Sequence, residues 1–171
     1  YAIPLCLQPM KHLSEFTVAD LADLASADIA RALAEDVASG DLTAALVDRS
    51  RSARARILAR EPAVICGVPW VQAAVLACDP TARLTWHVHE GQRCATDQVV
   101  LESEGNAQAL LTAERPGINF VQTLSAVATL THHHMKAIEG ASPNPRGCVV
   151  LDTRKTLPGL RLAQKYAVRV G

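Results

Sequence analysis

The side chains best suited to binding an anion lie together in residues 152–159, Asp-Thr-Arg-Lys-Thr-Leu-Pro-Gly. Arg154 offers a planar fork of donors that fits a carboxylate or a phosphate. Lys155 adds a mobile positive charge, and Thr153 adds a neutral donor. Together they could hold a ligand with several negative groups. A solvated basic loop would have the same composition, so the spacing alone leaves both interpretations open.

The elements around this loop are typical of a parallel α/β unit. Residues 148–151 form an uninterrupted apolar run, which predicts a strand buried on both faces. Helical periodicity covers residues 107–138 before it and about 160–170 after it. Ligands of such units bind at the carboxyl ends of strands, and the next helix adds its positive N-terminus. The predicted order therefore places residues 152–159 at a binding edge.

The first 105 residues or so have a different pattern, a helix followed by an antiparallel sheet. Residues 17–38 have helical periodicity, with Ser26 placed to cap a restart. An apolar stretch after Pro69 predicts a second helix through Ala77. Period-two alternation predicts strands at 52–60, 82–89 and 99–101. The expected fold class is α+β, followed by α/β.

The overall charge excludes capture of nucleic acid or of an anionic membrane by the chain as a whole. The 171 residues include 17 basic and 17 acidic side chains. Residues 1–50 carry 8 acidic and 3 basic side chains, whereas residues 141–171 carry 6 basic and 1 acidic. This asymmetry indicates a local anion site.

The remaining composition points to a folded protein of a reducing compartment. Apolar residues make up 49%, which excludes disorder, and no stretch approaches the roughly 20 apolar residues of a membrane span. The cysteines are scattered, so we expect buried thiols and a cytoplasmic location. They are Cys6, Cys66, Cys78, Cys94 and Cys148. The chain starts without Met and stops after a helical pattern, so we expect both ends to be cut.

Residues 152–168 closely resemble a stretch of quinolinate phosphoribosyltransferase, also called nicotinate-nucleotide pyrophosphorylase (carboxylating). The resemblance includes Asp-Thr-Arg-Lys-Thr, Pro-Gly and the Lys-Tyr-Ala-Val of residues 165–168. It continues in the right order through much of the chain, over about residues 28–171. The other matching stretches are Glu35-Asp36 with Gly40–Thr43, Ala63–Trp70, Trp86–Gly91, and Leu110–Arg115 with Asn119–Gln122.

The resemblance implies an N-terminal α/β sandwich in residues 1–112 and the beginning of a parallel α/β barrel in residues 113–171. It implies a homodimer in which each N-terminal domain caps the partner's barrel. The implied reaction converts quinolinate and phosphoribosyl pyrophosphate, with Mg²⁺, to nicotinate mononucleotide, pyrophosphate and CO₂ in NAD biosynthesis. Neither nucleic acid nor a membrane is an expected partner.

The resemblance also assigns roles to individual residues. Thr153, Arg154 and Lys155 are expected to bind carboxylate and phosphate groups, with Arg154 and Lys155 catalytic. Arg115 is expected to reach substrate in the neighbouring subunit's site. Ribosyl transfer passes through an oxocarbenium-like state, so rate would come from orientation and charge neutralisation. The Mg²⁺ ligands are expected downstream of this chain.

Two departures from the family pattern have consequences. Pro116-Gly117 follows Arg115, which predicts that the helix breaks at 115/116 and aims Arg115 differently. The family also continues past Gly171 with further phosphoribosyl and Mg²⁺ ligands, so the 171 residues alone are predicted to have little or no activity. A single barrel strand would leave Val149–Leu151 without parallel neighbours, which predicts misassembly, abnormal dimerisation or additional chain.

Two other functions remain open. A paralogous pyrophosphorylase associated with molybdenum transport would retain the loop but recognise another base. A non-catalytic dimerisation or binding module could be made from the first half of the fold. Quinolinate-dependent pyrophosphate release would distinguish quinolinate phosphoribosyltransferase from the first alternative. The length of the gene would distinguish it from the second.

Some polar clusters have simpler explanations. Glu35, Asp36 and Asp41 could suggest carboxylate chemistry, but carboxylates at a helix end beside a Gly turn more often cap the helix or pair with arginines. Consecutive helical residues point ~100° apart, so His132–His134 cannot share one tetrahedral ion.

Helical spacing also puts a basic stripe on the last helix. The stripe would line the anion site or a dimer contact, and it consists of Arg161, Lys165 and Arg169.

Overall fold

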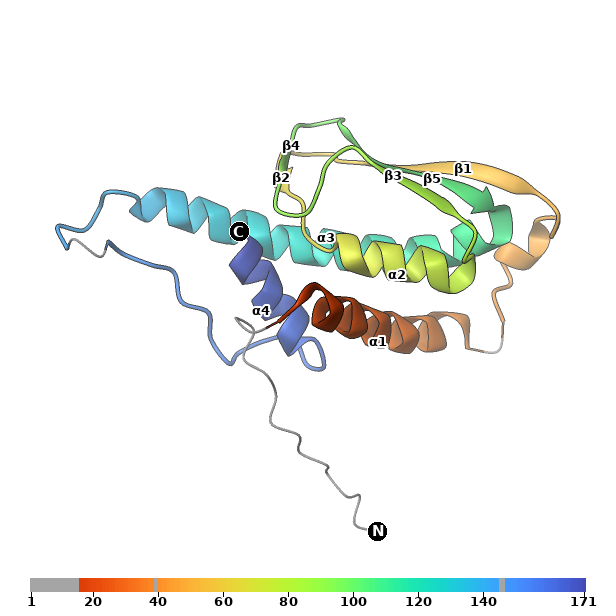
Figure 1. Ribbon diagram of the computed structural model, residues 1–171, viewed down its shortest axis with the longest axis horizontal. Helices are drawn as coiled ribbons and strands as arrows, with labels where there is room; N and C mark the ends of the chain where they lie inside the picture. Colours follow the sequence, from red (N-terminus) through yellow and green to blue (C-terminus); the bar gives the residue numbers. More distant parts are fainter. Residues whose placement is uncertain (1–15, 39, 145–146) are drawn as a thin grey trace, which may run out of the picture.

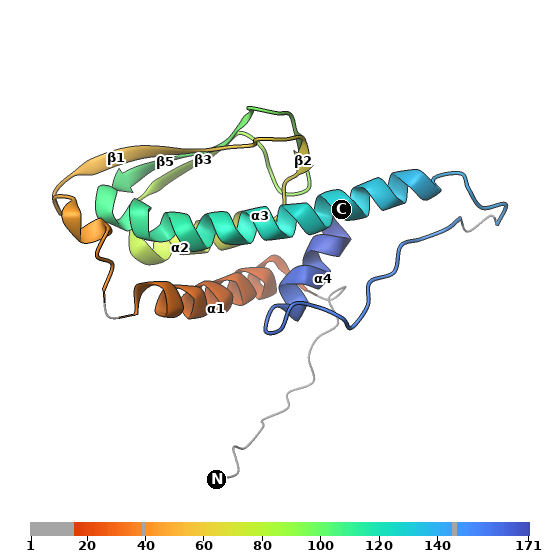
Figure 2. The ribbon, with the colours of Figure 1, turned by 180° about the vertical axis from the view of Figure 1, so that it is seen from behind.

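The computed structural model describes residues 16–38, 40–144 and 147–171. Its elements form three layers, with a sheet on one side, two helices in the middle and two helices on the other side (Figures 1 and 2). The antiparallel sheet with helices on one face confirms the α+β class expected for the first part of the chain.

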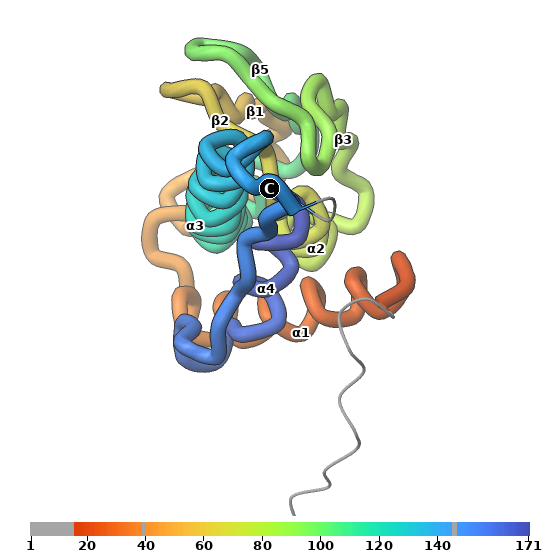
Figure 3. Tube along the Cα trace, turned by 90° about the vertical axis from the view of Figure 1, so that its left-hand side faces the viewer, coloured from red at the N-terminus to blue at the C-terminus, as the bar shows by residue number. Residues whose placement is uncertain are grey.

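Four helices make up the two helical layers. The middle layer contains α2 (Val68–Cys78) and α3 (Ala107–Ile138), which Figure 3 shows side by side beneath the sheet. The outer layer contains α1 (Val18–Val37) and α4 (Arg161–Val170). All four helices were predicted, and their bounds lie close to the expected ones.

Helix α1 begins at a capping box. The Thr17 hydroxyl oxygen accepts from the Asp20 N–H at 3.2 Å, and the Asp20 carboxylate accepts from the Thr17 N–H at 2.9 Å. The predicted restart at Ser26 is wrong, because α1 is continuous and Ser26 is exposed. Helix propensity on both sides of this serine is high enough to carry the helix through it.

The main sheet has three antiparallel strands in the order β1-β5-β3. A separate two-stranded sheet pairs β2 with β4, and β4 was not predicted because it contains only two residues. Along the chain, the short 3₁₀ helix η2 (Ala44–Leu46) follows α1 and precedes β1. The strands are β1 (Ser52–Leu58), β2 (Ala63–Val64), β3 (Arg83–Trp86), β4 (Arg93–Cys94) and β5 (Val99–Asn106).

Helix α3 runs without interruption through Pro116, so the predicted break at 115/116 is wrong. A proline inside a helix removes one hydrogen bond and costs ~3 kcal/mol. Pro116 is buried, and a Cβ added at Gly117 would lie 3.8 Å from the Ala74 Cβ and the Val71 Cα. This close packing of α3 on α2 offsets the lost hydrogen bond, and the helix continues.

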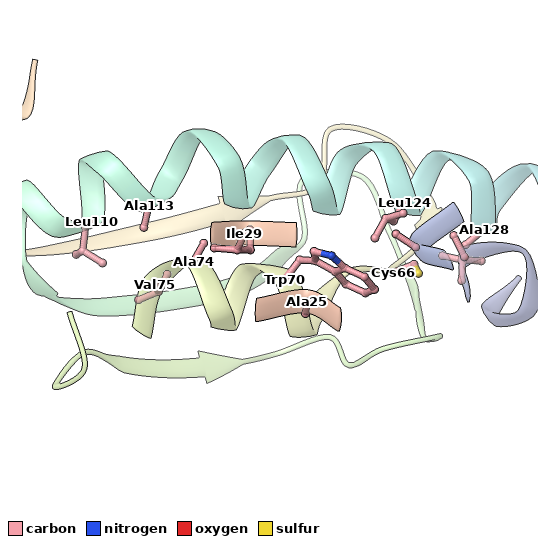
Figure 4. Close-up of a cluster of buried hydrophobic side chains, with 13 residues drawn as sticks. Ala25, Ile29, Cys66, Trp70, Ala74, Val75, Leu110, Ala113, Leu124 and Ala128 are labelled. Atoms are coloured by element: carbon pink, nitrogen blue, oxygen red, sulfur yellow. The ribbon is translucent and has the colours of Figure 1, made fainter. Parts of the chain in front are cut away.

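The main core lies between α1, α2 and α3, with α4 closing one end (Figure 4). At its centre is Trp70, whose indole is fully buried and donates from Nε1 to Oδ2 of Asp28 at 2.9 Å. The indole stacks near Phe120 and Tyr166, with ring centroids 6.1 and 5.7 Å away. One residue of α2 therefore contacts α1, α3 and α4.

The predicted buried strand at 148–151 is wrong. This segment has no regular secondary structure, and the side chains of Val149 and Leu151 are 62% and 80% exposed. A buried parallel strand needs neighbours to pair its backbone, and no described strand pairs with this segment. The apolar pattern is that of a strand, but its partners are not among the described residues.

The expectation of buried thiols holds for part of the set. Cys66 and Cys94 are buried and Cys78 is half-buried, but Cys148 is exposed because its segment lies outside the core. Cys6 lies outside the described residues. All four described cysteines are free thiols.

The expected domain boundary at 112/113 falls inside α3, and it stays a prediction. In the described part of the chain, no helix combines the length and the apolar character needed to cross a membrane.

Candidate functional site

The predicted anion-binding side chains lie on an exposed loop before α4. Thr153, Arg154 and Lys155 are all exposed. The Thr153 hydroxyl accepts from the Lys155 N–H at 3.1 Å, which fixes a tight local turn. Leu160 donates its N–H to the Leu157 carbonyl at 3.1 Å, which closes a second turn before the helix. The loop therefore presents its charged side chains to solvent from a defined backbone.

Two consecutive residues of α4 hold this loop at both ends. Lys165 forms an ion pair with Asp152, the first residue of the loop. Gln164 accepts from the Leu157 N–H through its Oε1 at 2.7 Å. Because α4 is a rigid element, these two contacts set where Thr153–Lys155 lie relative to the helix. The sequence placed Lys165 on a basic stripe of the last helix, but it did not predict the contact with Asp152.

Helix α4 is itself anchored to the core by Tyr166, which packs on Trp70. Burial raises the pKa of the Tyr166 phenol, and the charge of Glu90 and a hydrogen bond to it act in the same direction. The phenol therefore stays neutral at ordinary pH. The same Glu90 carboxylate accepts from the N–H groups of Gly67 and Val68 at 2.9 and 2.8 Å, at the N-terminus of α2. Glu90 thus connects α2 with α4.

The C-terminal end of α4 packs against α3. A Cβ added at Gly171 would lie 1.9 Å from the carbonyl oxygen of Ala128, so only glycine fits there. The helix that carries Lys165 is therefore fixed against α3 at one end and against Trp70 in the middle.

Arg115, the other predicted binding residue, lies elsewhere and is held by two carboxylates. Its Nε donates to Oδ2 of Asp36 at 2.9 Å, and its Nη2 lies 2.6 Å from Oδ2 of Asp41. These hydrogen bonds, first from Asp36 and then from Asp41, raise the pKa of Arg115 further above its ordinary value. The expectation that these carboxylates pair with an arginine or cap a helix is confirmed.

Asp41 is the more deeply fixed of the two carboxylates. It accepts from the Ala44 N–H at 3.0 Å, which caps η2, and from the Thr112 hydroxyl at 2.8 Å. The Ala44 hydrogen bond lowers the pKa of Asp41 most, followed by those from Arg115 and Thr112. The sequence contained Asp36 and Asp41 in matching stretches, but it did not show that they meet Arg115.

The structure does not bring Arg115 and the 153–155 loop together within one chain. Asp36 is in the last turn of α1 and Asp41 precedes η2, and these elements lie at one end of the molecule. The loop and α4 lie beside the opposite, N-terminal end of α1 (Figures 1 and 2). The predicted site residues therefore form two separate groups.

The other clusters show no metal chemistry. Among residues 16–38, 40–144 and 147–171, no three His, Cys, Asp or Glu side chains are grouped so as to hold an ion. His87 contacts Glu102 at 3.2 Å on the outer face of the sheet. Nε2 of His132 is buried on α3 without a hydrogen-bond partner in the described structure.

Comparison with known families relates both groups to one enzyme. The family model "Quinolinate phosphoribosyl transferase, N-terminal domain" matches residues 41–125, which include Asp41 and Arg115. The corresponding C-terminal domain model matches residues 127–171, which include the loop and α4. The chain belongs to the quinolinate phosphoribosyltransferase family.

Individual members of the quinolinate phosphoribosyltransferase family support the assignment. A nicotinate-nucleotide pyrophosphorylase [carboxylating] of Mycobacterium leprae is 40% identical over 156 residues, covering 87% of this chain and 52% of that protein. A probable nicotinate-nucleotide pyrophosphorylase of Bacillus subtilis is 33% identical over 137 residues, covering 80% of this chain and 46% of that protein. The chain therefore spans about half the length of these relatives.

Solved structures of the family have the same arrangement. The nicotinate-nucleotide pyrophosphorylase of Francisella tularensis superposes with a TM-score of 0.81 at 34% identity, covering 95% of this chain and 54% of that one. NadC from Streptococcus pyogenes gives a TM-score of 0.78 at 34% identity, over 92% of this chain and 53% of that one. The three-layer fold is thus the family fold over this part of the chain.

Proposed function

We propose that the protein containing this chain transfers a phosphoribosyl group from phosphoribosyl pyrophosphate to quinolinate. The products would be nicotinate mononucleotide, pyrophosphate and CO₂, in NAD biosynthesis. The observation that carries the proposal is the exposed loop of Thr153, Arg154 and Lys155, held at both ends by α4. The loop lies in the segment that matches the family's C-terminal domain.

The loop chemistry suits quinolinate, a dianion with two neighbouring carboxylates. The guanidinium of Arg154 can engage one carboxylate through two parallel hydrogen bonds. Lys155 can neutralise the second carboxylate or a phosphate as a point charge, and the Thr153 hydroxyl can donate to either. No carboxylate of the loop competes, because Asp152 is paired with Lys165.

The reaction itself needs cations rather than a nucleophilic side chain. A bond forms between the pyridine nitrogen and the ribose carbon as the bond from that carbon to pyrophosphate breaks. Negative charge grows on the leaving pyrophosphate, so fixed positive charges stabilise the transition state. Holding both substrates in line supplies the remaining acceleration. Arg154 and Lys155 would do both.

The proposed enzyme is a homodimer in which Arg115 completes the neighbouring subunit's site. The separation of Arg115 from the loop within one chain supports this, because a single copy cannot use both groups on one ligand. A symmetric dimer solves the problem by exchanging the same residue in both directions.

Mg²⁺ is the metal of the proposed reaction, and proteins usually hold it with one or two carboxylates, waters and substrate phosphates. The carboxylates next to the proposed binding residues are already engaged, because Asp152 pairs with Lys165 and both Asp36 and Asp41 pair with Arg115. We therefore propose that the Mg²⁺ ligands lie outside the described residues. For the same reason we predict that residues 1–171 alone have little or no activity.

We also propose a cytoplasmic location, because the described cysteines are free thiols.

The complete gene product tests the proposal by release of pyrophosphate that depends on quinolinate. We expect wild-type turnover, with kcat/KM reduced at least about 100-fold in Arg154→Ala, because a charge-assisted bidentate contact is lost. Arg56→Ala, an exposed arginine on β1, is the matched control and should retain wild-type turnover. Absence of wild-type turnover with quinolinate would reject the proposal in favour of another base or a non-catalytic role.

A further inference from the structure

Every nitrogen of the Arg115 guanidinium already contacts an acceptor in this structure. Nε and Nη2 contact Asp36 at 2.9 and 2.8 Å, and Nη2 also contacts Asp41 at 2.6 Å. Nη1 donates to the Leu111 carbonyl at 3.4 Å. One N–H of Nη1 remains, so a substrate carboxylate or phosphate can accept two parallel hydrogen bonds from Arg115 only if one of these contacts opens.

The two aspartates differ in how firmly they are held. Asp41 has two further donors besides Arg115, the Ala44 N–H and the Thr112 hydroxyl, and its side chain is 10% exposed. Asp36 contacts Arg115 closer to solvent, and its side chain is 31% exposed. Opening the Asp36 contact therefore breaks fewer hydrogen bonds and releases a carboxylate that water can solvate.

Charge favours the same opening. Two carboxylates around one guanidinium leave a local charge of about −1, which repels an anionic ligand. Asp36 also lies in the last turn of α1, where the helix dipole is negative and no basic side chain compensates it. Asp36 is thus placed where a carboxylate is least favourable, and Arg115 is the contact that holds it.

We propose that Asp36 is an internal competitor that occupies the substrate-binding fork of Arg115 and is displaced when an anionic substrate arrives, whereas Asp41 remains and orients the guanidinium. The proposal rests on the proposed function, in which Arg115 contacts quinolinate or the phosphoribosyl substrate of the neighbouring site. Under this proposal Asp36 weakens substrate binding by Arg115 and Asp41 strengthens it, although both pair with the same arginine.

Steady-state kinetics of the complete gene product test this opposition. In Asp36→Asn the substrate no longer displaces a charge, so the KM of the affected anionic substrate should fall about two- to fivefold, the range of an exposed ion pair. In Asp41→Asn the guanidinium loses its fixed anchor, so the same KM should rise roughly tenfold. Asp36→Glu restores the competing carboxylate and should return KM towards the wild-type value.

Glu35→Gln provides the matched control. Glu35 is the exposed neighbour of Asp36 in α1, and its replacement removes the same charge from the same helix end. It should leave KM unchanged, because a general electrostatic effect is not what we propose. Thermal unfolding shows whether each variant is folded. If Asp41→Asn does not fold, the direction of the change in KM in Asp36→Asn alone tests the inference.

A rise in KM in Asp36→Asn would overturn the inference and make Asp36 a positioning residue like Asp41. Equal changes in Asp36→Asn and Glu35→Gln would also overturn it. A wild-type protein without quinolinate turnover would instead reject the proposed function, so the two failures are distinguishable.

Discussion

Lys165 on α4 forms an ion pair with Asp152, the residue that begins the loop of Thr153, Arg154 and Lys155. The two residues are 13 positions apart, and the pair joins the start of the loop to the helix that follows it. Both side chains are largely covered, at 25% and 35% exposure. The pair therefore positions the loop and does not itself offer a charge to a ligand.

Loss of this ion pair should weaken substrate binding more than folding. We expect Lys165→Met in the complete gene product to raise the KM for quinolinate roughly threefold or more, because the loop is no longer fixed. The change in the free energy of unfolding should stay below about 1 kcal/mol, as for other partly exposed pairs. Asp152→Asn should have the same effect, and Lys136→Met on exposed α3 surface should have none. A large loss of stability with unchanged KM would contradict a positioning role.

Gly67 should tolerate no side chain. Its φ is +111°, and an added Cβ would lie 3.0 Å from the Cα of Val121 on α3. We expect Gly67→Ala to cost about 2–4 kcal/mol, from backbone strain and overpacking together. Urea unfolding measures the difference. Gly140→Ala is the control, because its φ is +70° with nothing within 4 Å of the added Cβ, so it should cost only about 1 kcal/mol.

The hydrogen bond between Trp70 and Asp28 should be a strong link between α1 and α2. Asp28→Ala leaves the buried indole N–H without its acceptor, which should cost about 1–3 kcal/mol. Asp23→Ala, which changes an exposed acidic residue of the same helix, is the control. That control should cost less than about 1 kcal/mol. Equal costs of the two substitutions in urea unfolding would contradict a strong link through the indole.

Asp79 should make stability depend on acid pH. The Asn106 N–H, at 2.8 Å, is the main cause that lowers the pKa of Asp79 below its ordinary 3.8, followed by the Thr81 hydroxyl and N–H. A lowered folded-state pKa contributes stability above about pH 4, which is lost as pH falls through the folded value. Thermal midpoints should therefore fall less steeply between about pH 4 and pH 2 in Asp79→Asn than in wild type. Equal slopes in Asp79→Asn and wild type would contradict the prediction.

The sequence predicted the long helices because their apolar residues recur with helical periodicity over several turns. The expected helix at 107–138 coincides with α3, although Pro116 suggested a break. Sequence spacing did not show that Pro116 and Gly117 would be buried where α3 packs on α2. The fold therefore followed the sum of contacts along α3 rather than one residue's propensity.

Features that depend on distant partners could not be predicted in the same way. Residues 148–151 have the composition of a buried strand, yet burial requires neighbouring strands that the segment lacks in the described structure. The Arg115–Asp36 contact joins residues 79 positions apart, and only the fold brings them together. The motifs indicated which residues are important, whereas the structure shows what they contact.

The proposed site combines the 153–155 loop of one subunit with Arg115 of the other. Mixing two variants of the complete gene product, Arg115→Ala and Lys155→Ala, each expected to be inactive alone, is the sharpest test of this sharing. After subunit exchange, half of the dimers should contain one subunit of each kind, and each such dimer has one intact site. We expect pyrophosphate release to recover to about a quarter of the wild-type rate. A mixture that stays as inactive as its two parents, with subunit exchange verified, would contradict it.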